Sequence, residues 1–333
     1  MAKSKSKKLY SMAQQTSERW FVVVNPVSGG GKGLGDFPRI SHLLRENGIE
    51  HDPAFTEHRY HATELAVEAV NRGYRKIIVV GGDGTLNEVV NGLFLQKQCE
   101  PKGVLLAVIA VGTGNDWVRT FGIPRNYTAA IRAIKEGHSF LQDVGKVVYT
   151  ESKVEHTRYM ANVAGLGFDA YVIQIFNHLK LKGYKGKWLY LYSLIRGFFS
   201  AKPAGATIEV DGKVIYNKLL FSLAAGVCRY NGGGIQQLPR AVANDGLLDL
   251  TIIRPVHWWH VVFRAKRLFN GQIYSIGHVE YAQGKEVKIT SAPPMPLETD
   301  GELQGETPVT ISVVPQAIKV VVTEESLQQN CHK

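Results

Sequence analysis

Three glycine-rich segments carry residue types that bind phosphate in proteins. The strongest is Gly81-Gly82-Asp83-Gly84-Thr85, which directly follows the apolar run 77–80. Glycines leave backbone N–H groups unshielded and permit positive φ, and a following helix directs its N-terminus at the same anion. We expect Asp83 to hold a magnesium ion or to orient phosphates. The alternative is a tight turn in which Asp83 is a capping residue, but the context GGDGTLNE after a buried strand favours binding.

The other two segments are weaker alone and stronger together. Residues 25–33, NPVSGGGKG, follow the apolar run 20–24 and lack the GxxxxGK[ST] spacing of a Walker A loop. Residues 112–116, GTGND, follow a third apolar run at 104–111. Each segment lies just beyond the carboxyl end of an expected strand, where ligands bind in open α/β sheets. Three such loops at one sheet edge predict a nucleotide site.

Helical patterns separate these expected strands. Apolar residues recur at helical spacing over residues 34–44 and again over residues 61–71. Alternating strands and helices are typical of a parallel sheet. We therefore predict a mainly parallel, Rossmann-like α/β domain over residues 18–144.

From about residue 145 the pattern changes. Short apolar runs separated by turn residues predict an antiparallel β-sandwich domain over residues 145–312. One helical pattern, at about residues 171–200, interrupts it. No Pro- or Gly-rich linker separates the halves, so we expect close packing with a cleft between the domains. Residues 1–17 contain four lysines and no acid, and we expect them to be a disordered basic tail.

Composition limits the class of protein. The 333 residues include 39 Lys and Arg against 29 Asp and Glu, a net charge of +10. No run approaches the roughly 18 apolar residues of a membrane-spanning helix, and no apolar signal core follows the basic N-terminus. Cys99, Cys228 and Cys331 are far apart, which indicates a reduced compartment. We expect a cytoplasmic protein.

The positive charge is concentrated. Residues 170–208 and 250–279 contain Lys and Arg among aromatic residues and no acid. This combination favours peripheral contact with a membrane surface that carries anionic lipid, although the same helices could instead be partly core. No nucleic-acid motif accompanies the charge, so we expect no specific nucleic acid. A homodimer remains open.

Six motifs, in this order, resemble the diacylglycerol kinase catalytic superfamily in its soluble bacterial lipid-kinase branch, whose core sphingosine and ceramide kinases share. They are NPVSG, GGDGTLNE, GTGND, AGLGFDA (164–170), NDGLLD (244–249) and TDGE (299–302). The resemblance implies an N-terminal α/β domain that binds ATP, to which the chain returns at about 313–325, and a β-rich domain that completes a lipid cleft. It also implies transfer of the γ-phosphoryl group from ATP–Mg²⁺ to the hydroxyl of diacylglycerol or a similar lipid.

The resemblance assigns a role to each motif. Glu302 is the expected proton acceptor from the lipid hydroxyl, with Asp300 and Asp83 as further catalytic acids. A Mg²⁺ ion is expected at Asp245, with main-chain ligands from Val242 and Leu247. Without the resemblance, NDG would be a hairpin turn and DGE an acidic turn. ATP contacts are expected from Asn25, Pro26, Val27, Ser28, Gly29, Thr56, Gly81, Gly82, Asp83, Gly84, Thr85, Leu86, Asn87 and Thr113.

Two other functions stay open. An NAD kinase-like enzyme for a soluble substrate would share GGDGT but needs a GSTAY-like stretch, which the sequence lacks. A non-catalytic nucleotide or lipid sensor usually loses an acid from its site, whereas Asp83, Asp245 and Glu302 are all present. The sequence does not choose among diacylglycerol, ceramide, a sphingoid base, phosphatidylglycerol and undecaprenol.

Overall fold

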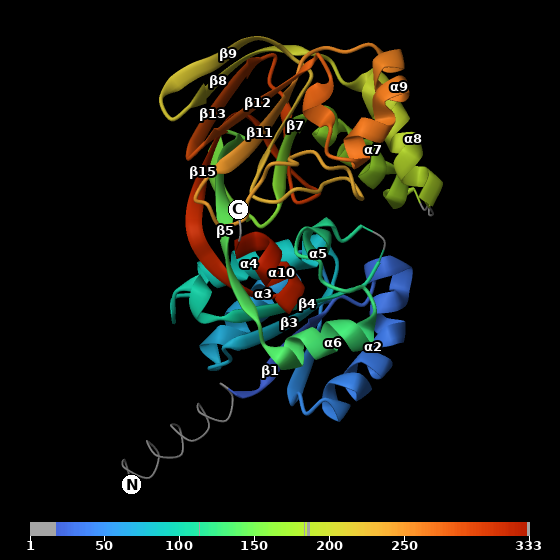
Figure 1. Ribbon diagram of the computed structural model, residues 1–333, viewed down its shortest axis with the longest axis vertical. Helices are drawn as coiled ribbons and strands as arrows, with labels where there is room; N and C mark the ends of the chain where they lie inside the picture. The colour runs from blue at the N-terminus through green and yellow to red at the C-terminus, as the bar shows by residue number, and fades with distance from the viewer. Residues whose placement is uncertain (1–17, 113, 183, 185–186, 332–333) are drawn as a thin grey trace. The chain divides into compact units, whose positions relative to one another are not determined.

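The computed structural model describes residues 18–331 except Thr113, Gly183 and residues 185–186. Its described part divides into two compact units, residues 18–143 with 316–331 and residues 144–315 (Figure 1). The chain leaves the first unit within β5 (Ser139–Glu151) and returns to it within β15 (Glu302–Val321). The expected basic tail, residues 1–17, and Thr113 lie outside the described residues.

The first unit alternates strands with helices, as predicted. The sheet order is β15-β4-β3-β1-β2, and each of these pairings is parallel. Because the strands run in one direction, the loops at their carboxyl ends emerge at one edge. The elements are β1 (Trp20–Val24), α2 (Ser28–Glu46), β2 (His51–Phe55), α3 (His61–Asn71), β3 (Lys76–Gly81), α4 (Asp83–Leu95), η1 (Pro101–Gly103), β4 (Leu105–Ala110), α5 (Asp116–Thr120), α6 (Tyr127–Glu136) and α10 (Glu324–Cys331).

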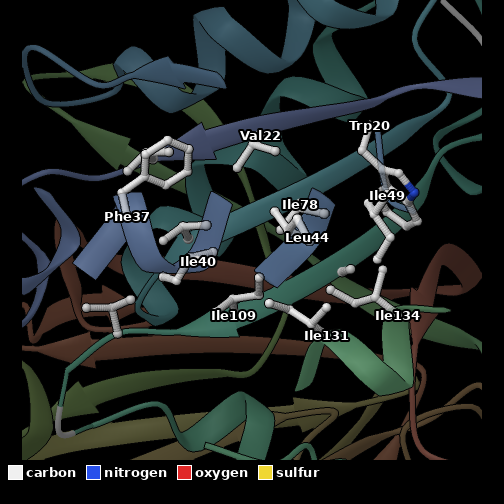
Figure 2. Close-up of a cluster of buried hydrophobic side chains, with 14 of the residues drawn as sticks. Trp20, Val22, Phe37, Ile40, Leu44, Ile49, Ile78, Ile109, Ile131 and Ile134 are labelled. Carbon is white, nitrogen blue, oxygen red and sulfur yellow. The ribbon is translucent and has the colours of Figure 1, made fainter. Parts of the chain in front are cut away.

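A hydrophobic core joins this sheet to α2 and α6 (Figure 2). Val22, Ile78 and Ile109 project from three neighbouring strands, and Leu44 of α2 and Ile131 of α6 pack against them. All five side chains are completely buried. Strands that are buried on both faces read as continuous apolar runs, which is why the sequence placed β1, β3 and β4 correctly.

The second unit is β-rich, and the predicted antiparallel architecture is confirmed. Its main sheet runs β12-β11-β10-β7-β14-β15, and β13 pairs with both β15 and β8. These pairings are antiparallel. The remaining elements are β6 (Val154–Met160), β7 (Val163–Gly167), α7 (Phe168–Leu181), α8 (Lys187–Ser200), β8 (Ala204–Val210), β9 (Lys213–Leu220), β10 (Ser222–Gly226), β11 (Leu248–Ile253), α9 (Trp258–Phe269), η2 (Ile273–Ser275), β12 (Val279–Gly284), β13 (Glu286–Ala292) and β14 (Pro296–Thr299).

The prediction of a single helix over residues 171–200 is wrong. The structure has two helices there, α7 and α8, which pack against each other. Helix α7 ends at Leu181, where the Lys182 N–H bonds to the His178 carbonyl. Two glycines, Gly183 and Gly186, follow in the sequence, and glycine disfavours continuation of a helix.

Candidate functional site

The structure brings the three glycine-rich loops of the first unit together. The Asn25 side chain donates to Thr85 Oγ1 at 2.9 Å, which ties the first loop to the second. Ser28 Oγ donates to the Val111 carbonyl at 3.4 Å, which ties the first to the third. At Gly82, an added Cβ would lie 3.3 Å from Asn115 Oδ1, so a larger residue at this position would have to displace the Asn115 side chain of the third loop. The predicted clustering of loops is therefore present.

The glycines of the first loop do two different things. Gly29, Gly30 and Gly31 have φ of 62°, 75° and 98°, although they fall within the bounds of α2. This left-handed backbone suits glycine and forms a concave turn of the kind that binds anions. Gly33 instead allows close packing, because a Cβ there would lie 1.9 Å from the Asn25 carbonyl oxygen.

Asp83 is a capping residue, as the alternative interpretation held, but the helix that it caps is α5, which begins 33 residues later in the chain. Its Oδ2 accepts the Asp116 N–H at 2.9 Å and its Oδ1 accepts the Trp117 N–H at 3.1 Å. Those amides begin α5, whose own N-cap residue, Asn115, makes no capping side-chain bond. Asp83 thus caps α5 from another segment, in the manner of an N-cap acceptor. We assign it to positioning the GTGND loop.

The start of α4 keeps its capacity to bind an anion. Its N-cap, Gly82, offers no side chain, so no cap bond forms. The amides of Gly84 and Thr85 belong to the first turn, where an α-helix supplies no acceptor. Leu86 and Asn87 are buried behind this turn and therefore support it, while Gly81 packs its backbone against the Thr85 side chain.

Glu88 connects the Thr56 segment to the same site. Its carboxylate accepts the N–H groups of Tyr60 and Ala62 at 3.1 Å each. Thr56 itself is held at the end of β1, because its N–H donates to the Val24 carbonyl at 2.9 Å. The motif GGDGTLNE therefore carries two acids that bind backbone amides of neighbouring loops. Sequence reasoning gave Glu88 no role, although its place in the motif was visible.

Pro26 and Val27 lie at the outer side of the first loop. Val27 is 75% exposed, and its N–H donates to Asn25 Oδ1 at 3.2 Å. This bond folds the loop back on itself, so that Asn25 both shapes its own turn and holds Thr85. The exposed Val27 leaves an apolar surface beside the polar loops.

In the second unit, the DGE motif is a tight hairpin turn between β14 and β15. Thr299 pairs with Glu302, and the two loop residues, Asp300 and Gly301, have φ of 49° and 83°. Two consecutive left-handed residues of the type Asp-Gly are typical of a two-residue hairpin loop. The turn holds Glu302 at the first position of β15, where the residue is partly exposed.

Asp300 is an anchor of this hairpin. Its buried carboxylate accepts the N–H groups of Ala161, Asn162 and Val163 at 2.7, 3.0 and 3.0 Å. Three backbone donors satisfy this buried carboxylate and hold it in place. We therefore treat Asp300 as a positioning residue.

Two further acids lie near the hairpin, Asp169 in the AGLGFDA motif and Glu298 just before the TDGE motif. The sequence analysis gave neither of them a role. Glu298 is 1% exposed, and its Oε2 accepts the Gly301 N–H at 2.8 Å. Asp169, in the first turn of α7, accepts from Ser222 and Gln237. Burial raises the pKa of Asp169, and burial together with the nearby Asp169 charge raises the pKa of Glu298 well above its usual range. An acid flanked by apolar strand residues, as in PLETD, was the available signal.

The residues expected to hold Mg²⁺ fit a hard cation. Asp245 is exposed, with its Oδ1 accepting the Leu247 N–H at 3.0 Å, and Val242 precedes it in the same loop. Asp249 is 1% exposed, and the Tyr281 hydroxyl lies close enough to its carboxylate to lower the pKa of Asp249. Burial first, and then the charge of Asp245, raises the pKa of Asp249 to about 6. A buried carboxylate in this state calls for a proton or a cation.

Another cluster of ligand-type side chains is less suited to a metal. His58, His61 and Glu64 converge near the start of α3. The two imidazole rings stack at 4.5 Å with 9° between their planes, so their lone pairs run nearly parallel. The Nδ1 of His61 also accepts the Glu57 N–H at 3.0 Å. We assign this cluster to the turn before α3.

Comparison with known proteins identifies the family. The diacylglycerol kinase catalytic domain matches residues 19–147, and the YegS C-terminal NAD kinase beta sandwich-like domain matches residues 162–322. A diacylglycerol kinase of Staphylococcus carnosus is 30% identical over 307 residues, which cover 91% of this chain and 95% of that protein. The chain belongs to the diacylglycerol kinase family. A diacylglycerol kinase of Staphylococcus aureus is 31% identical over 319 residues, 93% of this chain and 96% of that one.

Solved structures agree with membership of the diacylglycerol kinase family. A candidate diacylglycerol kinase from Bacillus anthracis superposes with a TM-score of 0.73 at 25% identity, over 93% of this chain and 98% of that chain. Yeast NADH kinase, solved with NADH, shares the fold alone, with a TM-score of 0.52 at 11% identity. The superposition covers 96% of this chain and 88% of that chain. The predicted resemblance and fold class are confirmed. Diacylglycerol kinase family membership supports a kinase that acts on a lipid over the NAD kinase-like alternative.

Gly33→Ala tests the close packing of α2 on the first loop. The new Cβ would overlap the Asn25 carbonyl oxygen, and overpacking of this kind costs about 1–3 kcal/mol. We expect the affinity for ATP, measured calorimetrically, to fall by about tenfold. The matched control is Gly35→Ala, where nothing lies within 4 Å of the added carbon; it should keep full affinity and gain slightly in stability.

Asp83→Ala tests the cap of α5. Loss of both acceptors leaves two amides unpaired, so we expect the free energy of unfolding in urea to fall by about 1–3 kcal/mol. The affinity for ATP should fall together with the stability. Asp83→Asn keeps one acceptor, so its stability should lie between those of wild type and Asp83→Ala. A direct metal ligand would behave differently: Asp83→Ala would then retain wild-type stability and change only the dependence of binding on Mg²⁺.

Proposed function

We propose that this protein is an ATP-dependent lipid kinase that transfers the γ-phosphoryl group to the hydroxyl of diacylglycerol or a similar lipid. The observation that carries the proposal is the fastening of three glycine-rich loops at one edge of a parallel sheet. Asn25, Ser28 and Asp83 make those fastening bonds. Unpaired first-turn amides and left-handed glycines then face a common ligand, and a triphosphate is the ligand that uses them all.

The first unit is assigned to ATP. Phosphoryl transfer depends mainly on position and charge neutralisation, and a rigid set of backbone donors supplies both without reorganisation. Gly29 to Gly31 and the first turn of α4 would bind phosphate oxygens. The Asp83 and Glu88 carboxylates bind amides of neighbouring loops, and so they keep these donors in place while the nucleotide exchanges.

The second unit is assigned to the acceptor. In the proposed step, Glu302 takes the proton of the lipid hydroxyl while the hydroxyl oxygen forms a bond to the γ-phosphorus. The bond between that phosphorus and the β–γ bridging oxygen breaks, and ADP leaves. Asp300 holds the hairpin that carries Glu302 by accepting three backbone N–H groups. General-base assistance of this type contributes about 10²–10⁴-fold.

Divalent cations have two places in this proposal. Mg²⁺ accompanies ATP and supplies charge neutralisation at the phosphates. A second ion would be held by Asp245 with main-chain oxygens of Val242 and Leu247, beside the buried carboxylate of Asp249. Oxygen ligands of this kind suit Mg²⁺, and a cation there would offset the cost of burying Asp249.

A lipid acceptor also requires contact with a membrane. No helix in the described part of the chain is long and apolar enough to cross one. We propose peripheral docking through exposed residues of α7, of α8 and of the segments that follow them, called here the α7–α8 surface. Leu181 is 89% exposed and Phe199 is 70% exposed, and residues 170–208 contain no acid. The surface comprises Lys180, Leu181, Lys182, Ile195, Arg196, Phe199 and Lys202.

Anionic lipid is the partner that this surface fits. Its exposed apolar side chains can enter the acyl boundary while its lysines and arginine remain among the headgroups. Each basic residue near an anionic surface contributes about 1 kcal/mol. We therefore propose that the protein is cytoplasmic and associates peripherally with membranes.

A transfer assay tests the enzyme assignment. Purified protein with labelled ATP and Mg²⁺ should label diacylglycerol in mixed micelles, and ceramide, phosphatidylglycerol and undecaprenol should be compared beside it. Glu302→Gln cannot accept a proton, so we expect kcat to fall by about 10²–10⁴-fold with ATP affinity retained. Glu306→Gln, on the same strand and exposed, is the control. Absence of any labelled lipid, from this panel or from a total lipid extract, would refute the proposal.

Charge reversal tests the membrane surface. Lys180→Glu with Lys182→Glu should weaken binding to vesicles containing phosphatidylglycerol by about tenfold or more, because attraction becomes repulsion. ATP affinity should not change. Lys97→Glu with Lys102→Glu makes the same charge change at exposed positions of the first unit and should bind vesicles as wild type does. Equal sedimentation of both double variants would remove the α7–α8 surface from the proposal.

A further inference from the structure

A pair of acids beside the DGE hairpin takes no part in the chemistry proposed above. Glu298 lies on β14, two residues before Asp300, and is 1% exposed. Asp169 is partly exposed as a residue, but its carboxyl group is enclosed and accepts from Ser222 Oγ at 2.8 Å and Gln237 Nε2 at 2.9 Å. Buried acids are rare in proteins unless they are paired, so this arrangement needs a reason.

The two side chains converge over Gly165. This residue lies opposite Glu298 in the register of β7 and β14. A Cβ at Gly165 would lie 2.6 Å from Glu298 Oε1 and 2.8 Å from the Asp169 Cβ. Any larger residue would displace one of the acids. The glycine of AGLGFDA therefore provides the space in which the pair sits, and the aspartate of the same motif is one of its members.

The pair also has an uncharged polar neighbour, Asn231. Asn231 donates to Glu298 and also, at 3.1 Å, to the Gln237 side chain that holds Asp169. The charged group that acts on Glu298 besides Asp169 is another acid, Asp300. Two carboxylates that share a buried site without a cation do not both ionise, and one of them retains a proton.

Glu298 acts on the hairpin through one bond. Its Oε2 accepts the N–H of Gly301 at 2.8 Å, and Gly301 is the left-handed residue directly before Glu302. Asp300 holds the turn by binding the start of β7. The turn is thus fastened on both of its loop residues, by Asp300 through its own carboxylate and by Glu298 through the Gly301 amide.

We propose that Glu298 and Asp169 form a positioning pair that fixes the Asp300–Gly301 turn in the conformation that presents Glu302. The inference rests on the proposed role of Glu302 as proton acceptor. Neither acid touches the reacting atoms. The pair supplies a buried acceptor for the Gly301 N–H, and one of the two acids retains a proton.

The proposed pair would make the hairpin sensitive to pH above the ordinary pKa range of a glutamate. When the retained proton leaves, two negative charges face each other beside Asp300, and the turn loosens. The sign for stability follows from the raised pKa of Glu298. The unfolded chain loses the Glu298 proton at the ordinary pKa of a glutamate, whereas the folded state keeps it to higher pH. The stability of the fold therefore decreases as the pH rises from the unfolded pKa of Glu298 through its folded pKa. Glu298→Gln removes this titration while its amide oxygen still accepts from Gly301.

Rate–pH profiles of the full chain provide the first test. With diacylglycerol micelles and ATP–Mg²⁺ from pH 6 to 10, wild type should lose activity on the alkaline side, by up to about tenfold per pH unit for one ionisation. Glu298→Gln should keep kcat at pH 7 within about threefold and lose that decline. Asp169→Asn should move the decline to lower pH, because the neighbouring charge that opposes ionisation is gone. Identical profiles for wild type and Glu298→Gln would overturn the proposal.

Hydrogen exchange provides a readout that needs no activity. After correction for the intrinsic rate, exchange of the Gly301 amide should accelerate with pH in wild type and in the control Glu306→Gln, but not in Glu298→Gln. Exchange that is the same in all three proteins would also overturn the proposal. Lack of lipid kinase activity in wild type would count against the proposed function instead, and the exchange measurement would still decide whether Glu298 holds the turn.

Discussion

The parallel pairing of β1, β3 and β4 is the constraint on which the first unit depends. Val24 pairs with Val80, and Gly81 pairs with Ala110. This register ends the three strands at one level, and their loops are then close enough to be joined by side-chain bonds. Burial of Ile78 and its neighbours on both faces of the sheet stabilises the register, because a slip would expose apolar residues. The candidate nucleotide site follows from the core.

Carboxylates in this protein bind backbone amides more often than their motifs suggest. Asp83 caps α5, Glu88 holds the segment before α3, and Asp300 binds the start of β7. A charged acceptor that satisfies otherwise unpaired amides stabilises a loop that has few apolar contacts of its own. In each case the acid and its amides come from different segments. Acids of this type organise the candidate site.

The two units organise their acids under different electrostatic conditions. In the first unit, amide donors and helix N-termini favour negative charge, which suits a nucleotide. In the second unit, burial raises the pKa of both Glu298 and Asp249. Such groups hold a proton or await a cation. One unit is thus suited to bind anions and the other to place protons and metal ions.

The sequence alone determined β1, β3 and β4, the positions of the glycine-rich loops and the fold class, because strand cores and glycine-rich turns are local patterns. It did not predict β2. It also marked Asp83, Asp300 and Glu302 as important. Only the tertiary structure showed which backbone amides Asp83 and Asp300 bind, and it divided the expected helix at 171–200 into α7 and α8. Asp83 and Asp116 lie 33 residues apart, and Glu298 meets Asp169 from another strand. Hydrogen bonds and burial join residues that are distant in sequence, and no local pattern records which partner a carboxylate will find.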